Sequence, residues 1–249
     1  MPASEPREDL HFADRTNSAG RAIKNQILLS IPASEFSVVR PFLEFGRLDR
    51  HCILHEPRER LKYAYFPNSG LISLVVAMED GKTVEAAVVG NEGAAGMPSA
   101  VYLKQSPLRE VVQIAGDCFR MEVGALQKIL RTLPHFQMKL SRYAVIQGMQ
   151  VAQTAACNRL HDIEQRLARW LLMAQDRVEQ TSMLITHDFL ATMLGTDRPS
   201  VSLAAGLLQK KGNIEYTRGV VEILSRKKLE SSACECYDVI RRFNAEMSF

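Results

Sequence analysis

The sequence lacks any long hydrophobic run. Its 249 residues are 46% hydrophobic, which is enough to bury a core, but no apolar stretch approaches the roughly 20 residues that a membrane-spanning helix needs. The first nine residues carry three acidic side chains and no hydrophobic segment, unlike a signal peptide. We therefore expect a cytoplasmic protein with no membrane partner and a flexible polar tail over residues 1–20. At roughly 100–200 residues per domain, its length predicts two domains.

Cysteine is scarce as well, and its spacing is irregular. The chain has five cysteines, an odd number, and none of them lies in residues 1–51. Their spacing matches neither a disulfide framework nor a zinc ribbon. On one helix, Cys234 and Cys236 would point to different faces. The cysteines are therefore interpreted as reduced thiols that mostly pack, and neither a metal nor a cofactor is predicted.

A strong net charge is also missing. The chain has 31 basic and 28 acidic side chains, a net charge of +3, so its composition alone does not indicate a nucleic-acid partner. However, residues 198–228 contain seven basic and two acidic side chains, a local charge of +5, which leaves −2 for the remainder. This basic patch favours a polyanionic partner at one end of the chain, although an ordinary solvated surface explains the charge equally well.

Strand-like sequence occupies residues from about 47 to 120. The segments YAYFP, GLISLVVAMEDGKTVEAAVVG and REVVQIAG are rich in β-branched and aromatic residues. Asp80-Gly81 between two such runs is typical of a hairpin turn. We therefore expect an antiparallel β domain, with bounds at residues 21–134.

A long helix is predicted after Pro134, because no proline or glycine cluster interrupts the chain from about His135 to Cys157. Its apolar stripe needs a partner, which is either its own β domain or a second copy of the helix. We predict that residues 135–160 form a dimerisation helix and hinge, although packing inside one chain would leave the same pattern. The expected interface residues are Leu140, Tyr143, Ala144 and Val151.

The stretch LGTDRPSVSLAAGLLQKKGN, residues 194–213, indicates a helix-turn-helix. Gly195 allows a tight turn, Asp197 suits the N-cap of the second helix, and Pro199 suits its first turn. In this motif the start of the second helix enters the major groove of DNA. The residues expected to contact DNA are Thr186, Asp197, Arg198, Pro199, Ser200, Ser202, Leu203, Lys210 and Arg218.

A hairpin follows the two helices. The segment IEYTRGVVEIL alternates and turns at Arg218-Gly219, so the helix-turn-helix is predicted to be winged. An ordinary helical hairpin with a capped second helix remains an alternative for residues 194–213 considered alone. The wing and the preceding long helix favour the DNA-binding interpretation.

Taken together, the order of these parts resembles the Crp/Fnr superfamily of bacterial transcription regulators, most specifically from DIEQRLARWLL through ITHDFLATMLGTDRPSVS to the wing. The resemblance implies an α+β fold with an N-terminal antiparallel β-roll of the cyclic-nucleotide-binding type, followed by a long dimerisation helix. Residues 161–249 would then form a winged helix-turn-helix domain that ends in a helical extension. It also implies a homodimer that binds double-stranded DNA, contacts RNA polymerase and responds to an unknown effector, which is either a small molecule or a protein signal.

The effector position departs from the cyclic-nucleotide-binding pattern of this superfamily. In the segment GNEGAAGMPSAVYLKQSPLREVV, Gly96 and Arg109 match the cassette glycine and arginine, but Met97 replaces the glutamate and Glu110 replaces the hydroxyl residue. A carboxylate beside the phosphate position repels a cyclic nucleotide. We therefore expect the effector not to be cyclic AMP, and Arg109 to be a solvated or ion-paired strand residue.

Other chemical sites are weaker. An Fnr-like iron–sulfur centre needs clustered N-terminal cysteines, which residues 1–51 lack. His51 and His55 could approach one metal, but exposed strand histidines are the commoner case. His161-Asp162 and His187-Asp188 each match half of a metal-phosphohydrolase motif at a helix start.

We therefore expect no enzymatic activity, since no nucleophile–base pair or phosphate-binding loop is evident. Two alternatives to a transcription regulator remain. One is a ligand- or partner-binding adaptor that does not read DNA, and the other is an enzyme that uses the β-roll cavity.

Overall fold

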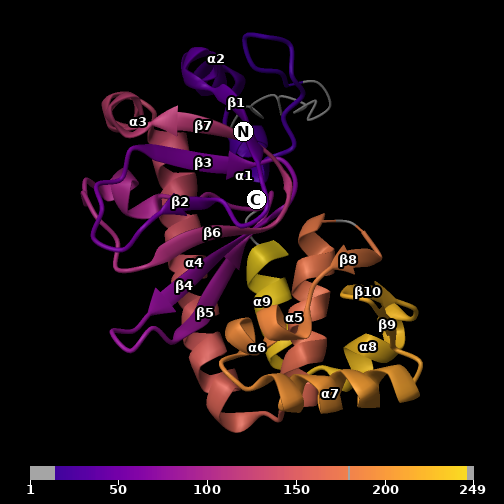
Figure 1. The fold of residues 1–249 in the computed structure, drawn as a ribbon. Helices are drawn as coiled ribbons and strands as arrows, with labels where there is room; N and C mark the ends of the chain where they lie inside the picture. Colours follow the sequence, from indigo (N-terminus) through magenta and orange to yellow (C-terminus); the bar gives the residue numbers. More distant parts are fainter. Residues whose placement is uncertain (1–14, 179, 246–249) are drawn as a thin grey trace, which may run out of the picture.

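The computed structural model describes residues 15–178 and 180–245. It shows an α+β fold in which a β domain is joined through one long helix to a helical domain with a small sheet (Figure 1). Within the described ranges, no helix has both the length and the apolar character needed to cross a membrane.

The part of the chain that packs against the β domain begins nearer to the N-terminus than the sequence predicted. Residues 1–14 of the predicted tail lie outside the described residues, but residues 15–20 are placed. Arg15 donates hydrogen bonds to the carbonyl oxygens of Leu28 (2.7 Å) and Ile31 (2.6 Å), and the side chain of Asn17 is buried. The prediction of a flexible tail is therefore wrong for residues 15–20. The short helices that follow are α1 (Gln26–Ser30), α2 (Ala33–Val39) and the 3-10 helix η2 (Arg40–Phe42).

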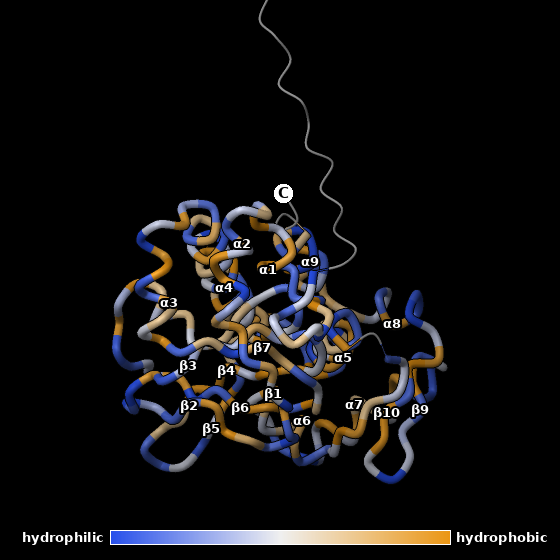
Figure 2. The backbone as a smooth tube through the Cα atoms, turned by 90° about the horizontal axis from the view of Figure 1, so that it is seen from above, coloured by the Kyte–Doolittle hydropathy of each residue, from blue (hydrophilic) through white to orange (hydrophobic). Residues whose placement is uncertain are grey.

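The β domain consists of two antiparallel sheets, as expected for a β-roll. The hairpin predicted at Asp80-Gly81 joins β4 and β5, and Gly81 has the positive φ (84°) that such a turn requires. Apolar segments lie where the strands face one another, and hydrophilic segments lie in the outer loops (Figure 2). One sheet has the order β1 (Glu44–Leu48), β7 (Gly116–Glu122), β3 (Tyr63–Pro67), and the other has the order β2 (Ile53–His55), β6 (Arg109–Ile114), β4 (Leu71–Ala77), β5 (Thr83–Val89).

Helix α4 (Pro134–Leu160) is the predicted long helix, one residue longer at its start and three at its end than expected. A tertiary partner caps it, because the carboxylate of Glu35 accepts hydrogen bonds from the backbone N–H groups of His135 (3.0 Å) and Phe136 (2.8 Å). The helix follows η3 (Met97–Val101) and α3 (Val123–Leu130) in the chain.

The burial of α4 corrects part of the predicted dimer interface. Leu140 and Tyr143 are each 2% exposed and belong to the core of the β domain. These two side chains therefore face the protomer's own sheets and not a partner. Val151 is half-buried and Ala144 is exposed. A helical period identifies an apolar face, but it does not say which surface covers that face.

The C-terminal domain contains the predicted winged helix-turn-helix. Strand β8, which the sequence pattern did not reveal, completes a three-stranded sheet of order β8-β10-β9. The last helix packs on both α4 and α5. The elements are α5 (Ile163–Val178), β8 (Ser182–Leu184), α6 (His187–Leu194), α7 (Arg198–Lys210), β9 (Ile214–Thr217), β10 (Val220–Ile223), α8 (Arg226–Ser232) and α9 (Cys236–Ala245).

The two domains meet through buried polar contacts. The indole Nε1 of Trp170 on α5 donates to the buried carboxylate of Glu85 on β5 (2.8 Å), and Arg177 pairs with Glu92 (2.8 Å). Burial raises the pKa of Glu85 to about 7, although Ser73 and Trp170 both donate to it. We refer to these two contacts as the domain junction.

Candidate nucleic-acid interface and effector position

Local hydrogen bonds set the ends of the two helices of the helix-turn-helix. The hydroxyl of Thr186 caps α6 by accepting from the Phe189 N–H (3.2 Å), and the carboxylate of Asp197 caps α7 by accepting from the Ser200 N–H (2.8 Å). Between the helices, Gly195 adopts the left-handed conformation (φ 59°) that closes α6. The Ser200 hydroxyl also donates to Asp197 (3.0 Å). In this structure Thr186, Asp197 and Ser200 therefore all take part in helix caps.

Helix α7 has one apolar side and one exposed side. Val201, Ala204, Ala205 and Leu208 are buried against the domain. On the other side lie the exposed side chains of Arg198, Pro199, Ser202, Leu203 and Lys210, and Leu203 is 72% exposed although it is apolar. An exposed leucine among basic and small polar residues suits contact with another molecule.

Arg198 lies at the N-terminal end of α7, close to the start of α6. Its guanidinium Nη1 is 3.6 Å from the carboxylate of Asp188, and both side chains are largely exposed. An exposed ion pair of this kind contributes little free energy of stabilisation in water. Arg198 can therefore exchange Asp188 for a base edge or a phosphate at little cost.

His187 is a residue whose role the sequence analysis missed. Its ring stacks on Tyr216 of β9, with ring centroids 4.0 Å apart, and its Nδ1 lies 2.9 Å from the hydroxyl oxygen of Ser202 on α7. Burial, followed by the charge of Arg198, lowers the pKa of His187. One imidazole thus joins α6, α7 and the wing, and it orients Ser202. The only sequence signal was His187-Asp188 at a helix start.

The wing is the hairpin of β9 and β10. Arg218 (φ 52°) and Gly219 (φ 83°) form its turn with two positive φ angles, as two-residue hairpins require. The Arg218 side chain is exposed at this tip. Arg218 therefore adds an exposed cationic side chain on the wing, in addition to Arg198 on α7.

At the effector position, Gly96 and Glu110 contact each other directly. The Gly96 N–H donates to both carboxylate oxygens of Glu110, at 2.9 and 3.0 Å. Glu110 is buried, and burial raises its pKa to about 7. A Cβ atom at Gly96 would lie 2.6 Å from the carbonyl oxygen of Tyr63, so this glycine permits a close backbone approach. The buried carboxylate occupies the donor that an anionic ligand would need.

The other two effector residues make different contacts. Arg109 pairs with Glu56 (2.9 Å), in agreement with an ion-paired strand residue, and Met97 is buried at the start of η3. His55 is buried, not exposed as expected, and its Nε2 donates to the carbonyl oxygen of Tyr63 (2.9 Å). Burial lowers the pKa of His55, whereas His51 lies exposed in a turn before β2.

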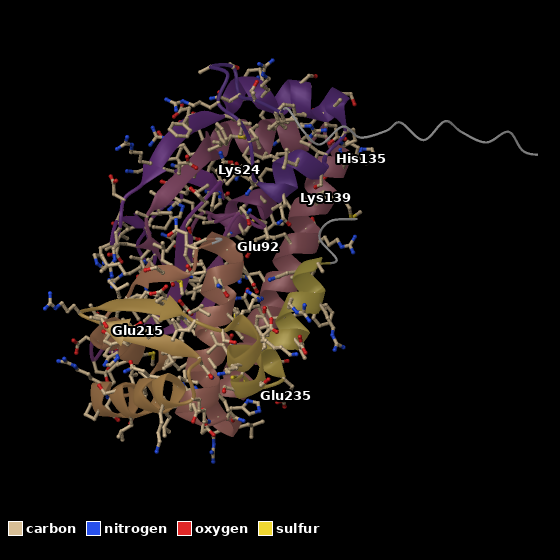
Figure 3. The ribbon with its side chains drawn as sticks, turned by 90° about the vertical axis from the view of Figure 1, so that its right-hand side faces the viewer. Lys24, Glu92, His135, Lys139, Glu215 and Glu235 are labelled. Atoms are coloured by element: carbon tan, nitrogen blue, oxygen red, sulfur yellow. The ribbon has the colours of Figure 1, made fainter. Side chains whose placement is uncertain are left out.

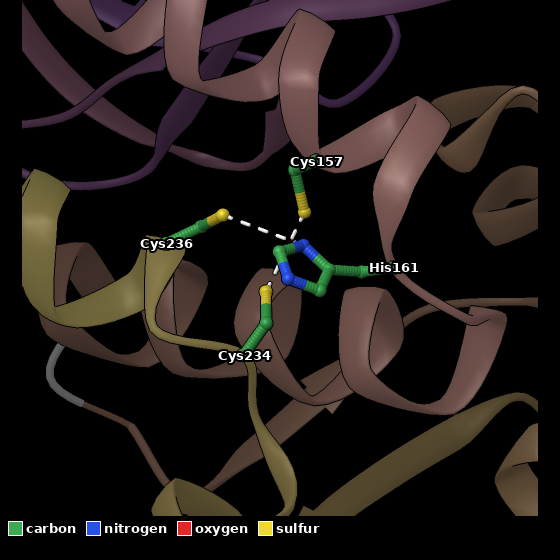
Figure 4. A group of neighbouring side chains, drawn as sticks. All are labelled: Cys157, His161, Cys234 and Cys236. Atoms are coloured by element: carbon green, nitrogen blue, oxygen red, sulfur yellow. Dashed lines mark hydrogen bonds between the residues drawn. The ribbon is translucent and has the colours of Figure 1, made fainter.

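A third group of residues converges where α4 meets the C-terminal helices. The sulfur atoms of Cys157, Cys234 and Cys236 and the imidazole of His161 point toward one another (Figure 4), and their ligand atoms all lie within 4.8 Å. The interpretation of Cys234 and Cys236 as residues of one helix is wrong, because α9 begins at Cys236 and Cys234 lies before it, in the segment that follows α8. The sequence spacing predicted no metal site, since it did not reveal that Cys157 and Cys234 are neighbours.

The comparisons with known proteins agree with this geometry. Residues 165–232 match the family model of the Crp-like helix-turn-helix domain. No curated protein matches the chain. The described fold is similar to solved structures at low sequence identity, which supports the fold alone.

Three of these structures illustrate the similarity. FixK2 from Bradyrhizobium japonicum is 15% identical, with a TM-score of 0.67, over 77% of this chain and 98% of that one. The c-di-GMP-responsive regulator CLP from Xanthomonas campestris is 14% identical (TM-score 0.64; 78% and 100%). A CRP-family regulator from Thermus thermophilus is 20% identical (TM-score 0.62; 76% and 96%). The resemblance to the Crp/Fnr superfamily therefore holds at the level of the fold, and residues 165–232 form a Crp-like helix-turn-helix domain.

Proposed function

We propose that this protein is a homodimeric, sequence-specific transcription regulator that reads double-stranded DNA with α7 and the wing. The observation that carries the proposal is the exposed side of α7, which combines an exposed arginine, small polar groups and an exposed leucine above an apolar packing side. RNA polymerase is the further partner that this type of regulator implies. We refer to Arg198, Ser202, Leu203, Lys210 and Arg218 as the reading surface.

The chemistry of the reading surface fits a duplex. Arg198 can form paired hydrogen bonds with guanine, and Leu203 can contact a thymine methyl group. Lys210 and Arg218 lie at the end of α7 and at the wing tip, where they suit phosphates. His187 holds the Ser202 hydroxyl in place, which reduces the freedom that this side chain would lose on binding.

A second copy of the chain is the proposed partner of α4. The side of this helix that faces away from the β domain exposes Met138 (67%), Val145 (58%) and Met149 (43%). These residues are seven and four positions apart, the spacing of a coiled-coil seam. Ala152 and Ala156 continue the stripe with small exposed residues, which permits close helix contact.

The dimer is tested by charging this stripe. Val145→Glu should give a monomer in sedimentation at micromolar concentration, whereas Ser37→Glu, an exposed substitution on α2, should leave the dimer intact. A dimeric Val145→Glu protein would show that this side of α4 is not the interface.

The proposed effector is a small molecule other than cyclic AMP. The buried Glu110 carboxylate occupies the Gly96 N–H, and Arg109 is engaged by Glu56, so the groups that would hold a cyclic phosphate already have partners. Instead, a cavity of about 220 Å³ lies between η3 and α4 and is mostly apolar. Its lining includes Met97, Val101, Leu130, Leu140, Gln137 and Gln147. Millimolar cyclic AMP should leave the melting temperature unchanged; a rise of several degrees would contradict this proposal.

The DNA-reading proposal is tested by selecting bound sequences from a random duplex library and measuring affinity for the selected site. Arg198→Ala should cost about 1–3 kcal/mol on that site and relax one base-pair preference per half-site if Arg198 reads a base. If it only grips phosphate, binding should weaken equally on all sequences and the salt slope should fall by about one per site. Arg241→Ala, an exposed arginine of α9 paired with Asp238, is the matched control and should bind as wild type.

Failure to select any sequence would favour the adaptor that keeps this fold without reading DNA. If the Arg198→Ala protein bound DNA with unchanged affinity and unchanged salt dependence, α7 would be a packing helix and not the DNA-reading helix.

A further inference from the structure

The group of Cys157, His161, Cys234 and Cys236, which we refer to as the cysteine cluster, has the geometry of a metal site. Cys157 Sγ lies 3.5 Å from Cys234 Sγ, and Cys236 Sγ lies 3.5 Å from His161 Nδ1. All four ligand atoms lie within 4.8 Å of one another. Two sulfurs held tetrahedrally at about 2.3 Å from one zinc ion lie roughly 3.8 Å apart. The cluster is therefore close to the size of a single tetrahedral ion.

The backbone brings these four residues together from two distant segments. Cys157 and His161 lie one helical turn apart at the end of α4, and Cys234 and Cys236 flank the start of α9 (Figure 4). The three cysteines are at most 4% exposed and form a buried cluster separate from the two large apolar cores. Thiols used only for packing would join an aliphatic core, so this separate sulfur cluster favours a chemical role.

A carboxylate orients the histidine. Glu235 Oε2 lies 3.2 Å from His161 Nε2, the ring nitrogen that does not face Cys236. Metal-bound histidines usually donate their other ring N–H to a carboxylate, a backbone carbonyl or water. Here Glu235 would fix the tautomer that leaves Nδ1 free for the metal. Glu235 lies near the end of α4 that is remote from His135 and Lys139 (Figure 3).

Further donors surround the sulfurs. Gln153 Nε2 donates to Cys236 Sγ (3.0 Å). Arg166 and Arg169 are both buried, and the Nε of each has no hydrogen-bond partner among the described residues. Zinc with three thiolates carries a net charge of −1, which these buried cations would balance.

We propose that Cys157, His161, Cys234 and Cys236 bind one Zn²⁺ ion in a closed, structural Cys₃His site that ties the C-terminal extension to the end of the long helix. Binding releases one proton from each of the three thiols, and the neutral imidazole ligates through Nδ1. Four protein ligands leave no open position for a substrate, so the site is structural and not catalytic. A disulfide would use only two of the sulfurs and would leave the His161–Glu235 pair without a function.

The first test measures metal in the full-length protein purified under reducing conditions without added chelator. Elemental analysis should find one zinc per chain. Replacement by Co²⁺ should give the visible absorption bands of a tetrahedral, thiolate-rich site, and this measurement needs no variant. Cys234→Ser should lose both signals. Cys118→Ser is the matched control, because Cys118 is equally buried but lies in the β domain, and it should retain both.

A second variant isolates the positioning of His161. Glu235→Gln should weaken zinc affinity about 10–100-fold in a chelator competition, while Glu230→Gln, a glutamate of α8 that pairs with Arg226, should not. Removal of zinc should lower the melting temperature of wild type but not that of Cys234→Ser. None of these readouts involves DNA, so they can fail without affecting the proposed function.

Three results would overturn the proposal. The first is a reduced wild-type protein that contains no zinc and gives no cobalt bands. The second is a Cys157–Cys234 disulfide in anaerobically purified protein, which would make the cluster a redox pair. The third is iron with sulfide in place of zinc, which would make it an iron–sulfur centre.

Discussion

The reading surface and the domain junction are built in opposite ways. The reading surface is exposed, and most of its geometry comes from neighbours in the sequence: Asp197 caps the helix that carries Arg198, and Ser200 closes the same cap. The junction is buried, and its partners Glu85 and Trp170 are 85 residues apart. Substitutions in the first region should therefore change recognition without unfolding the protein, and substitutions in the second should change stability.

The largest expected effect is at Trp170. Trp170→Ala should lower the free energy of unfolding by about 3–5 kcal/mol, because it removes a fully packed indole and leaves the buried Glu85 carboxylate with one donor fewer. Urea denaturation followed by circular dichroism measures this loss. Trp170→Phe keeps most of the ring and loses only the N–H, so it should cost less than the alanine. Equal losses would show that the Glu85 contact, not packing, holds the junction.

The next effect is a pH dependence that belongs to the junction. The pKa of Glu85 is raised from its usual 4.5 to about 7, so the folded state holds a proton more tightly than the unfolded chain. This contribution to stability is fully present below about 4.5 and is lost as the pH rises through about 7. Glu85→Gln should therefore flatten the decline in melting temperature between these values.

Glu110, whose pKa is also raised to about 7, would keep part of that decline in the Glu85→Gln protein. Glu215→Gln, in the exposed wing, is the control and should leave the slope unchanged. If the slope of Glu85→Gln matched that of wild type, the buried carboxylate would not be the titrating group.

The smallest effect should appear at His187, which contacts the reading surface through Ser202. His187→Ala removes the hydrogen bond to Ser202 and the stacking on Tyr216, and it should weaken DNA binding by about 0.5–1.5 kcal/mol. Fluorescence anisotropy on the selected site measures this change, and thermal melting checks that the fold persists. A loss of several kcal/mol in stability would break the comparison, because His187 would then belong with the junction residues.

The comparison also explains what the sequence could reveal. Caps and turns at Thr186, Gly195 and Asp197 depend on residues a few positions away, so the helix-turn-helix was predictable. The helical period of α4 was predictable too, but Leu140 and Tyr143 were assigned to the wrong partner, because periodicity does not identify what covers a face.

The contacts that the sequence could not reveal join distant segments. The cysteine cluster needs α9 to pack on α4, which brings Cys157 beside Cys234 although 77 positions separate them. Strand β8 is three residues long and owes its existence to β10. The local sequence pattern does not predict such features, because only tertiary packing brings the residues together.

The core that underlies the junction has a thermodynamic consequence. Leu71, Val75 and Val88 of the β domain belong to the same apolar cluster as Leu171 and Leu190 of the C-terminal domain. A ligand that favours one arrangement of the β domain therefore changes the free energy of the arrangement in which α7 is held. Such coupling is reciprocal. If the proposed effector changes the affinity for DNA by some factor, DNA must change the affinity for that effector by the same factor, so each ligand reports on the other in a binding titration.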